Sequence, residues 1–426
     1  MQIEALHNLF LKSNGVCTDT RKITENCLFF ALKGDNFNGN TFANEALERG
    51  ASHAVIDDLQ HHQSSGKTIL CKDVLSMLQQ LAMFHRNYLN LPIIGLTGSN
   101  GKTTTKELIA AVLSTTYTIS ATKGNLNNHI GVPLTLLDMY SGTEMGIVEM
   151  GANHQKEIEK LCSIAQPDYG YITNFGKAHL EGFGGVEGVI KGKTELYAFL
   201  KQSDGTAFTN ANDPKQMELS LHLSRYTLGT DSSDCPIHLL DASEFILVKY
   251  HDQHIKSNLV GKYNYHNIAA AIAIGQYFKV SPSNIKTAIE GYIPSNNRSQ
   301  LIEKNGHHIL LDAYNANPTS MMAAIENFEQ SNGEHKVLIL GDMFELGEAA
   351  ADEHQQITSY LEKHPFGKVY LVGENFFKTT HSGAHITLSK TFEDFKASLK
   401  NNTFSSNHIL IKGSRGMALE RVLEVL

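Results

Sequence analysis

A glycine-rich segment between an apolar run and an amphipathic stretch constrains the fold more than any other feature of the sequence. Residues 93–97 form the apolar run, residues 97–105 read Thr-Gly-Ser-Asn-Gly-Lys-Thr-Thr-Thr, and a helix is predicted over 103–115. A strand, a glycine-rich turn and a helix in this order are typical of a phosphate-binding loop, in which backbone N–H groups converge on phosphate oxygens. Leu96 stands where the strict pattern of such loops has its first glycine. The sequence therefore predicts a parallel α/β sheet with a nucleoside triphosphate site at one edge.

The side chains around this segment suit phosphate and metal chemistry. Lys102 supplies a compact positive charge, and the hydroxyl of Thr103 can bind Mg²⁺. A second apolar run at 146–150 places Glu149 near the carboxyl end of a strand, where α/β sheets bind ligands and a carboxylate can hold Mg²⁺. The alternatives are an ordinary turn with an incidental lysine and a glutamate paired with a surface lysine; the order of strand, glycines, Lys-Thr and helix disfavours both. The predicted nucleotide-binding residues are Thr97, Gly98, Ser99, Asn100, Gly101, Lys102, Thr103 and Thr104.

The chain length and two breaks in the pattern indicate three domains. At about 150 residues per domain, 426 residues correspond to about three. Asn90-Leu91-Pro92 ends a helical pattern, and residues 291–297 read as a linker rich in turn residues. We therefore predict an α/β protein with an N-terminal α/β domain over 1–89, a central P-loop ATPase-like parallel sheet over 90–293, and a C-terminal Rossmann-like doubly wound sheet over 294–426.

Composition excludes several classes of protein. The net charge of −8 argues against a basic face for nucleic acid, and no apolar stretch approaches the ~18 residues of a membrane span. The N-terminal residues lack the basic and apolar regions of a signal peptide. The five cysteines are scattered, with no Cys-x-x-Cys pair, as expected for reduced thiols in a cytoplasmic protein.

Segments spread over nearly the whole chain resemble the Mur ligase family, ATP-dependent amide-forming enzymes of bacterial cell-wall precursor synthesis. Besides the glycine-rich loop they are residues 18–21, 29–34, 125–128, 149–153, 174–184, 312–318, 341–347 and 412–415. Ala-His-Leu-Glu-Gly-Phe-Gly at 178–184, Tyr-Asn-Ala-Asn-Pro at 314–318 and Gly-Asp-Met-Phe-Glu-Leu-Gly at 341–347 are similar to the MurF branch. The branch that adds diaminopimelate or lysine instead carries Asp-His-Leu-Asp-like and Tyr-Ala-His-x-Pro-like segments, which this chain lacks.

The resemblance implies a reaction, a cosubstrate and two metal ions. ATP would convert the terminal carboxylate of UDP-N-acetylmuramoyl-tripeptide into an acyl phosphate, which the amine of D-alanyl-D-alanine would attack. Lys102 would act in catalysis, Thr103 and Glu149 would bind one Mg²⁺, and His179 would bind the second. The family also uses a lysine carbamylated on its side-chain nitrogen to support the second ion. Lys193 matches that position best, and Lys191 is the runner-up.

The resemblance also assigns substrate contacts to each domain. Asn264 and Asn267 would contact adenine, Arg298 would reach ATP from the third domain, and Asp312 would take the ribose hydroxyls; Tyr263 stands where the family has histidine. The remaining implied contacts with the UDP part, the peptide and the dipeptide are Thr20, Arg21, Asn125, Asn127, Asn128, Asn315, Asn317, Lys412 and Arg415. Of these, Thr20 and Arg21 would bind the UDP part, and Lys412 with Arg415 would meet the carboxylate of the dipeptide.

The sequence leaves two alternatives open. One is another amide-forming Mur ligase or an enzyme like folylpolyglutamate synthetase; the UDP-binding-like N-terminal domain argues against the folate enzyme. The other is a P-loop regulatory ATPase, whose ATP turnover would not depend on an amino acceptor. We further expect a monomer in the cytoplasm that binds no nucleic acid and does not insert into a membrane.

Overall fold

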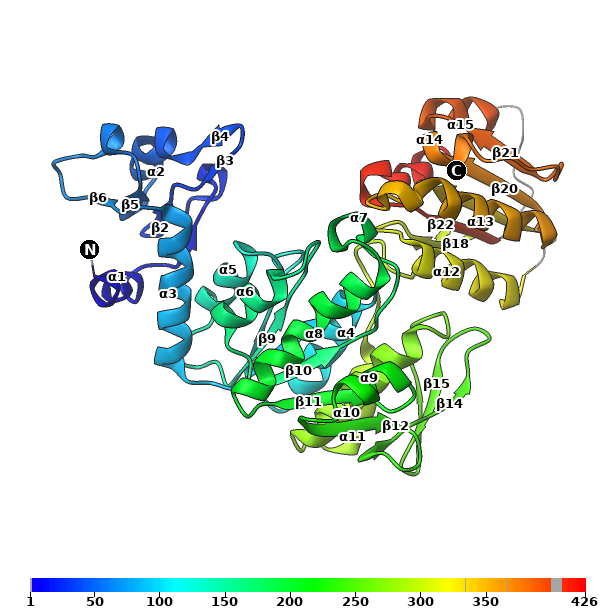
Figure 1. The fold of residues 1–426 in the computed structure, drawn as a ribbon, viewed down its shortest axis with the longest axis horizontal. Helices are drawn as coiled ribbons and strands as arrows, with labels where there is room; N and C mark the ends of the chain where they lie inside the picture. The colour runs from blue at the N-terminus through cyan, green and yellow to red at the C-terminus, as the bar shows by residue number, and fades with distance from the viewer. Residues whose placement is uncertain (1, 334, 365, 400–407) are drawn as a thin grey trace.

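The structure is a computed structural model that describes residues 2–333, 335–364, 366–399 and 408–426. Three α/β units follow one another along the chain (Figure 1), with the N-terminal and C-terminal units at opposite ends and the central unit between them. This confirms the predicted three-domain α/β architecture. The boundaries after residues 89 and 293 stay predictions. Within the described residues, no helix is both long enough and apolar enough to cross a membrane.

The N-terminal unit is built on a small parallel sheet. Its strand order is β1-β2-β5-β6, and all neighbours are parallel. The long helix α3 begins after Asp73, whose side chain accepts from the Ser76 N–H, and ends at Asn90 in the left-handed conformation, as the Asn-Leu-Pro break predicts. The elements are β1 (Val16–Cys17), β2 (Leu28–Phe30), β3 (Lys33–Gly34), β4 (Phe37–Asn38), β5 (His53–Ile56), β6 (Thr68–Leu70), α1 (Ile3–Phe10), α2 (Ala43–Glu48) and α3 (Val74–Leu89).

The central unit is a seven-stranded parallel sheet covered on both faces. Its order is β13-β12-β11-β10-β7-β9-β8, so that the first strand of the unit, β7, lies between β9 and β10. The strands are β7 (Ile93–Thr97), β8 (Ile119–Ala121), β9 (Met145–Glu149), β10 (Tyr169–Ile172), β11 (Thr206–Asn210), β12 (Ser224–Gly229) and β13 (Cys235–Pro236). The chain leaves β7 toward β8 on one side and later returns to β10 on the other. The carboxyl ends of these strands therefore form the switch point at which open α/β sheets bind ligands.

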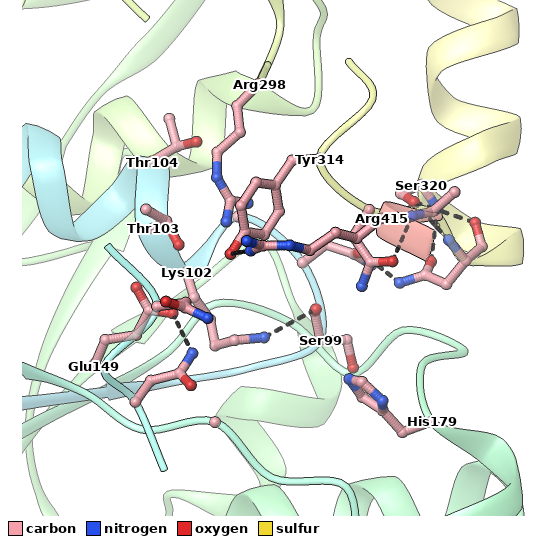
Figure 2. A pocket seen from close by; sticks show the side chains of 18 of the residues that line it. Ser99, Lys102, Thr103, Thr104, Glu149, His179, Arg298, Tyr314, Ser320 and Arg415 are labelled. Carbon is pink, nitrogen blue, oxygen red and sulfur yellow. Dashed lines mark hydrogen bonds between the residues drawn. The ribbon is translucent and has the colours of Figure 1, made fainter. Parts of the chain in front are cut away.

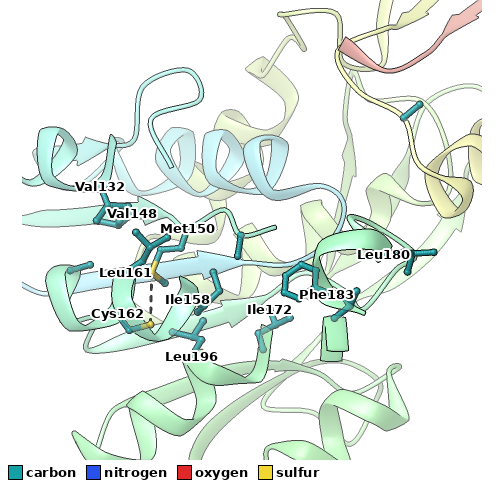
Figure 3. Packing of buried hydrophobic residues seen from close by; sticks show 14 of the residues in the cluster. Val132, Val148, Met150, Ile158, Leu161, Cys162, Ile172, Leu180, Phe183 and Leu196 are labelled. Carbon is teal, nitrogen blue, oxygen red and sulfur yellow. Dashed lines mark hydrogen bonds between the residues drawn. The ribbon is translucent and has the colours of Figure 1, made fainter. Parts of the chain in front are cut away.

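Helices bury the central sheet from both sides. On one face Met150, Leu161, Cys162, Ile172 and Leu196 pack together between the sheet, α6 and α8 (Figure 3). On the other face α4 packs against β7, β8 and β9, and α10 packs against α4, β11 and β12. The helices are α4 (Lys102–Leu113), α5 (Gly131–Leu137), α6 (Glu157–Ala165), α7 (Leu180–Phe183), α8 (Val186–Gln202), α9 (Pro214–Leu219), α10 (Asn264–Tyr277) and α11 (Pro282–Gly291), and an antiparallel sheet of β14 (His238–Asp241), β15 (Leu247–Tyr250) and β16 (Gln253–Lys256) is added.

The C-terminal unit is a six-stranded sheet of order β17-β18-β22-β19-β20-β21. All neighbours are parallel except the edge hairpin of β17 and β18, which the alternating strands and helices of the sequence did not predict. The elements are β17 (Gln300–Lys304), β18 (His307–Asp312), β19 (Lys336–Gly341), β20 (Lys368–Val372), β21 (Ile386–Ser389), β22 (His408–Lys412), α12 (Pro318–Gln330), α13 (Ala350–Lys363), α14 (Glu374–Phe377) and α15 (Phe392–Leu399).

Candidate active site

The glycine-rich loop turns between β7 and α4 in the geometry expected of a phosphate-binding loop. Gly98 and Gly101 have φ angles of +142° and +79°, which side-chain-bearing residues rarely adopt. A Cβ at Gly101 would lie 2.5 Å from Oδ1 of Asn267, and one at Gly98 would lie 1.9 Å from Oγ1 of Thr173. Both positions therefore require glycine for its backbone conformation and for its lack of a side chain.

Lys102 folds back over the loop. Its Nζ donates to the carbonyl oxygens of Gly98 at 2.7 Å and Ser99 at 3.2 Å, so the ammonium group lies against the turn of the loop (Figure 2). Burial lowers the pKa of Lys102, the nearby charge of Glu149 opposes this shift, and the charge of Arg298 adds to it. Lys102 of the central domain and Arg298 of the C-terminal domain are therefore close enough for their charges to interact.

Glu149 and Thr103 lie beside this lysine as the sequence predicts. Glu149 is 1% exposed, and its Oε1 accepts from the side-chain N–H of Asn127 at 2.8 Å. Its Oε2 is buried and has no hydrogen-bond partner. A buried carboxylate oxygen without a partner is costly, so the site fits a cation at this oxygen. No cluster of three or more His, Cys, Asp or Glu side chains suited to a metal occurs in the described ranges.

His179 joins the central and C-terminal domains. It has the left-handed φ of +53° just before α7, and its Nδ1 contacts a carboxylate oxygen of Glu345. The hydrogen bond from His179 lowers the pKa of Glu345. Glu345 lies within the segment 341–347 that resembles the family, but the sequence alone does not assign it a role. The one sequence feature that points to Glu345 is its place as a charged residue in a turn after the end of a predicted strand.

The two candidate lysines on α8 lie in different environments. Lys193 is 1% exposed, its Nζ donates to the Ala152 carbonyl at 3.3 Å, and it lies 4.9 Å from the centre of the Phe183 ring. Burial, with the charge of Lys102 adding to it, lowers the pKa of Lys193 well below its ordinary value. Lys191 is exposed. The structure therefore buries Lys193, and not Lys191, beside Ala152, which lines the cavity.

The C-terminal domain forms the opposite wall. Lys412 is 2% exposed and pairs with Asp312 at 2.5 Å, and a second oxygen of Asp312 accepts from the backbone N–H of Ser299 at 3.1 Å. Arg415 is exposed at the rim and donates to the hydroxyl of Tyr314 at 2.8 Å. Of the two cations predicted for the dipeptide carboxylate, Lys412 is therefore engaged by Asp312, and Arg415 is the more accessible.

Several of the predicted asparagines form side-chain hydrogen bonds that connect different segments around the site. Asn317 caps α12 and donates to Oδ1 of Asn100 at 2.7 Å, which links the C-terminal domain to the glycine-rich loop. Asn267 accepts from Thr105 at 2.9 Å and donates to Asn264 at 2.8 Å. The first helical residue of α10 is Asn264. The other predicted asparagines at the cavity are Asn125, Asn128 and Asn315.

These residues line one cavity of about 850 Å³ between the central and C-terminal domains. Every lining residue lies at position 99 or beyond, so the N-terminal domain does not contribute to it. The residues predicted for the UDP part line a separate hollow: Thr20 and Arg21 lie there with the stacked rings of Phe37 and Phe42, 5.4 Å apart. Arg21 is largely exposed and pairs with Asp19 at 2.8 Å. The structure thus brings the predicted site residues together in two places, apart from Thr97, Gly98 and Lys193, which line neither hollow.

Family models match all three domains of the chain. A model described as the Mur ligase family, catalytic domain, matches residues 12–86, the Mur ligase middle domain matches 96–275, and the Mur ligase, glutamate ligase domain, matches 297–415. The chain belongs to the Mur ligase family.

Relatives of this Mur ligase share one name. UDP-N-acetylmuramoyl-tripeptide--D-alanyl-D-alanine ligase of Bacillus subtilis (strain 168) is 37% identical over 97% of this chain and 93% of that protein. The ligase of the same name from Escherichia coli (strain K12) is 33% identical over 97% of this chain and 93% of that protein.

Solved structures of similar ligases have the same fold. A crystal structure of MurF from Acinetobacter baumannii, 30% identical, covers 96% of this Mur ligase and 92% of that chain with a TM-score of 0.86. MurF ligase from Thermotoga maritima in complex with ADP is 27% identical, covers 98% and 97% of the two chains, and has a TM-score of 0.84.

Proposed function

We propose that this Mur ligase adds D-alanyl-D-alanine to UDP-N-acetylmuramoyl-tripeptide at the expense of ATP, giving the UDP-linked pentapeptide, ADP and phosphate. The observation that carries the proposal is the cavity in which the glycine-rich loop with Lys102 faces Arg298 and Arg415 of the C-terminal domain. The relatives that match nearly the whole chain are ligases named for this reaction. Peptidoglycan precursor synthesis is the process that this reaction serves.

The chemistry explains why a phosphate site and an amine site share one cavity. A carboxylate is a poor electrophile, so its oxygen first attacks the γ-phosphorus of ATP, the bond to the β-phosphate oxygen breaks, and ADP leaves. The amine of the dipeptide then attacks the acyl carbon, loses a proton, and displaces phosphate. Phosphoryl transfer depends mainly on positioning and charge neutralisation, which Lys102 and Arg298 supply. The walls of the cavity would exclude water from the reactive acyl phosphate.

Two Mg²⁺ ions fit the donor groups at the site. Glu149 and Thr103 would hold one ion, which the buried oxygen of Glu149 without a partner supports. His179 would bind the second ion after its ring nitrogen no longer contacts the carboxylate of Glu345. Bound Mg²⁺ would neutralise phosphate charge in the nucleotide.

A carbamylated Lys193 is part of the proposal. A neutral amine adds to the carbon of CO₂ and loses a proton, which turns a cation into a carboxylate-like group. Burial favours the neutral amine at Lys193 because it lowers the pKa, whereas Lys191 is exposed. From the sequence, either Lys193 or Lys191 could be the carbamylated lysine. The burial of Lys193 supports Lys193.

The cytoplasm is the proposed location, and the protein is proposed to act as a monomer without nucleic acid. All five cysteines are free thiols, as expected in a reducing compartment that contains ATP. Light scattering on the purified protein tests the monomer.

The reaction is tested by measuring phosphate release from ATP with UDP-N-acetylmuramoyl-tripeptide, with and without D-alanyl-D-alanine. We expect release that depends on the dipeptide and is abolished in Lys102→Ala. Equal release without the dipeptide would favour a regulatory ATPase. Release that requires a single amino acid and UDP-N-acetylmuramoyl-dipeptide instead would favour another branch of the family.

A further inference from the structure

Tyr314 lies between two arginines at the wall of the cavity. The guanidinium carbon of Arg298 lies 3.6 Å from the centre of the Tyr314 ring, and that of Arg415 lies 4.9 Å from it. Arg415 also donates to the Tyr314 hydroxyl at 2.8 Å. In Figure 2 the Arg298 side chain runs alongside the tyrosine ring, and Arg415 approaches the same ring.

The backbone builds this arrangement. The N–H of Tyr314 donates to the carbonyl of Asn297 at 3.1 Å, and the N–H of Ser299 donates to Asp312 at 3.1 Å. These two bonds flank Arg298 and tie its segment to the loop that carries Tyr314. The stacking of Arg298 on the ring therefore follows from the anchored backbone on both sides.

Neither arginine forms an ion pair with a carboxylate of the part of the chain that the structure describes. Within the described residues, the arginines that form ion pairs are Arg21, Arg49 and Arg86. The Nε of Arg298 is buried and has no hydrogen-bond partner. Two like charges held near one ring without an anion create a site for anionic ligands, and the aromatic face stabilises the cations until a ligand arrives.

We propose that Tyr314 is a positioning residue for both substrates: its ring holds Arg298 toward the nucleotide, and its hydroxyl holds Arg415 toward the carboxylate of the incoming dipeptide. This inference rests on the proposed function and adds to it a residue that couples two binding sites. The charge of Arg298 acts on Lys102 of the phosphate loop, which places Arg298 on the nucleotide side. Arg415 is exposed and lines the same cavity, so it is accessible to the second substrate.

The two contacts use different atoms, so substitutions can separate them. Tyr314→Phe keeps the ring under Arg298 and removes only the hydroxyl that holds Arg415. Tyr314→Leu removes both. The experiment measures the KM for ATP and the KM for D-alanyl-D-alanine, each with the other substrates saturating. We expect Tyr314→Phe to raise the KM for the dipeptide about fivefold, the effect of one lost hydrogen bond, and to leave the KM for ATP within about twofold. Tyr314→Leu should raise both.

Tyr360→Phe is the matched control, because it removes a tyrosine hydroxyl that donates to Glu329 at 2.9 Å in the same domain but outside the cavity. It should change neither KM. Equal changes of both KM values in Tyr314→Phe, or a fall in kcat alone, would overturn the inference. A wild-type protein without dipeptide-dependent phosphate release would instead overturn the proposed function, so the two failures are distinguishable.

Discussion

At the scale of single residues, the contrast between Lys191 and Lys193 shows how burial changes the protonation and reactivity of a lysine amine. The two positions are two residues apart on α8, and two residues correspond to about 200° around a helix, so their side chains point to nearly opposite faces. One face packs against Phe183 and Ala152, and the other meets solvent. A lysine buried without a carboxylate partner is unfavourable as an ammonium group, and this favours the form that can react with CO₂.

This contrast gives the first prediction. With ¹³C-labelled bicarbonate, the wild-type protein should show a carbamate carbon signal by NMR that is absent from Lys193→Arg and retained in Lys191→Arg. Arginine keeps the positive charge and does not form the carbamate. Phosphate release should fall by about 100-fold in Lys193→Arg, as for the loss of a group that supports a metal, and should persist in Lys191→Arg. Loss of the signal in Lys191→Arg would reverse the assignment.

The residues that could be predicted from the sequence are those whose neighbours in the chain define their role. Lys102 and Thr103 follow from the local order of strand, glycines and helix, and Glu149 follows from its place at a strand end. Tyr314 and Glu345 were missed because their contacts, with Arg298 and with His179, join segments far apart in sequence. Local patterns carry no information about such pairings.

At the scale of elements, agreement is closest where an element is buried and regular. β7 has the predicted bounds and is buried at every position, and α4 differs from its predicted range by one or two residues at each end. β17 was missed because its alternating half-buried and exposed residues, Gln-Leu-Ile-Glu-Lys, lack an apolar run. An antiparallel edge strand needs only one covered face, so its sequence signal is weak.

The glycine-rich turn between β7 and α4 carries the second prediction. Gly101→Ala should weaken ATP binding by more than about tenfold, because the new methyl group would meet Asn267 at a φ of +79° and displace the N–H groups of the loop. Gly66→Ala is a matched control with a φ of +77° and no atom within 4 Å of the new methyl group. Both should lose about 1 kcal/mol of stability from backbone strain, but only the first should lose affinity. Calorimetric titration with ATP measures the difference; equal affinities would contradict the argument.

At the scale of the whole molecule, the site exists only where two domains meet. Asn317 bonds to Asn100 of the glycine-rich loop, His179 contacts Glu345, and Lys177 pairs with Glu353 at 2.6 Å. The hollow that Thr20 and Arg21 line lies on the N-terminal unit, which stands at the opposite end of the molecule from the C-terminal unit (Figure 1). The position of the C-terminal domain therefore decides whether the groups for phosphate and dipeptide face one another.

The Lys177–Glu353 pair gives a prediction at this scale. Glu353 lies on α13 with a side chain only 10% exposed, and Lys177 precedes His179 by two residues. Lys177→Glu would place two carboxylates in contact, push α13 away from the segment that carries His179, and lower kcat/KM for ATP about tenfold. Because the cause is repulsion between two named charges, the reversed pair Lys177→Glu with Glu353→Lys should regain most of that loss.

The double variant separates an interdomain contact from a general effect of surface charge. Lys215→Glu is the control, because Lys215 pairs with Glu218 within α9 at 3.2 Å and joins no domains; its kcat/KM should stay within about twofold of wild type. If the two reversals at 177 and 353 simply multiply their losses, the charges do not interact during catalysis. Recovery of kcat/KM in the double variant would mean that the enzyme uses ATP with the central and C-terminal domains in contact through residues 177 and 353.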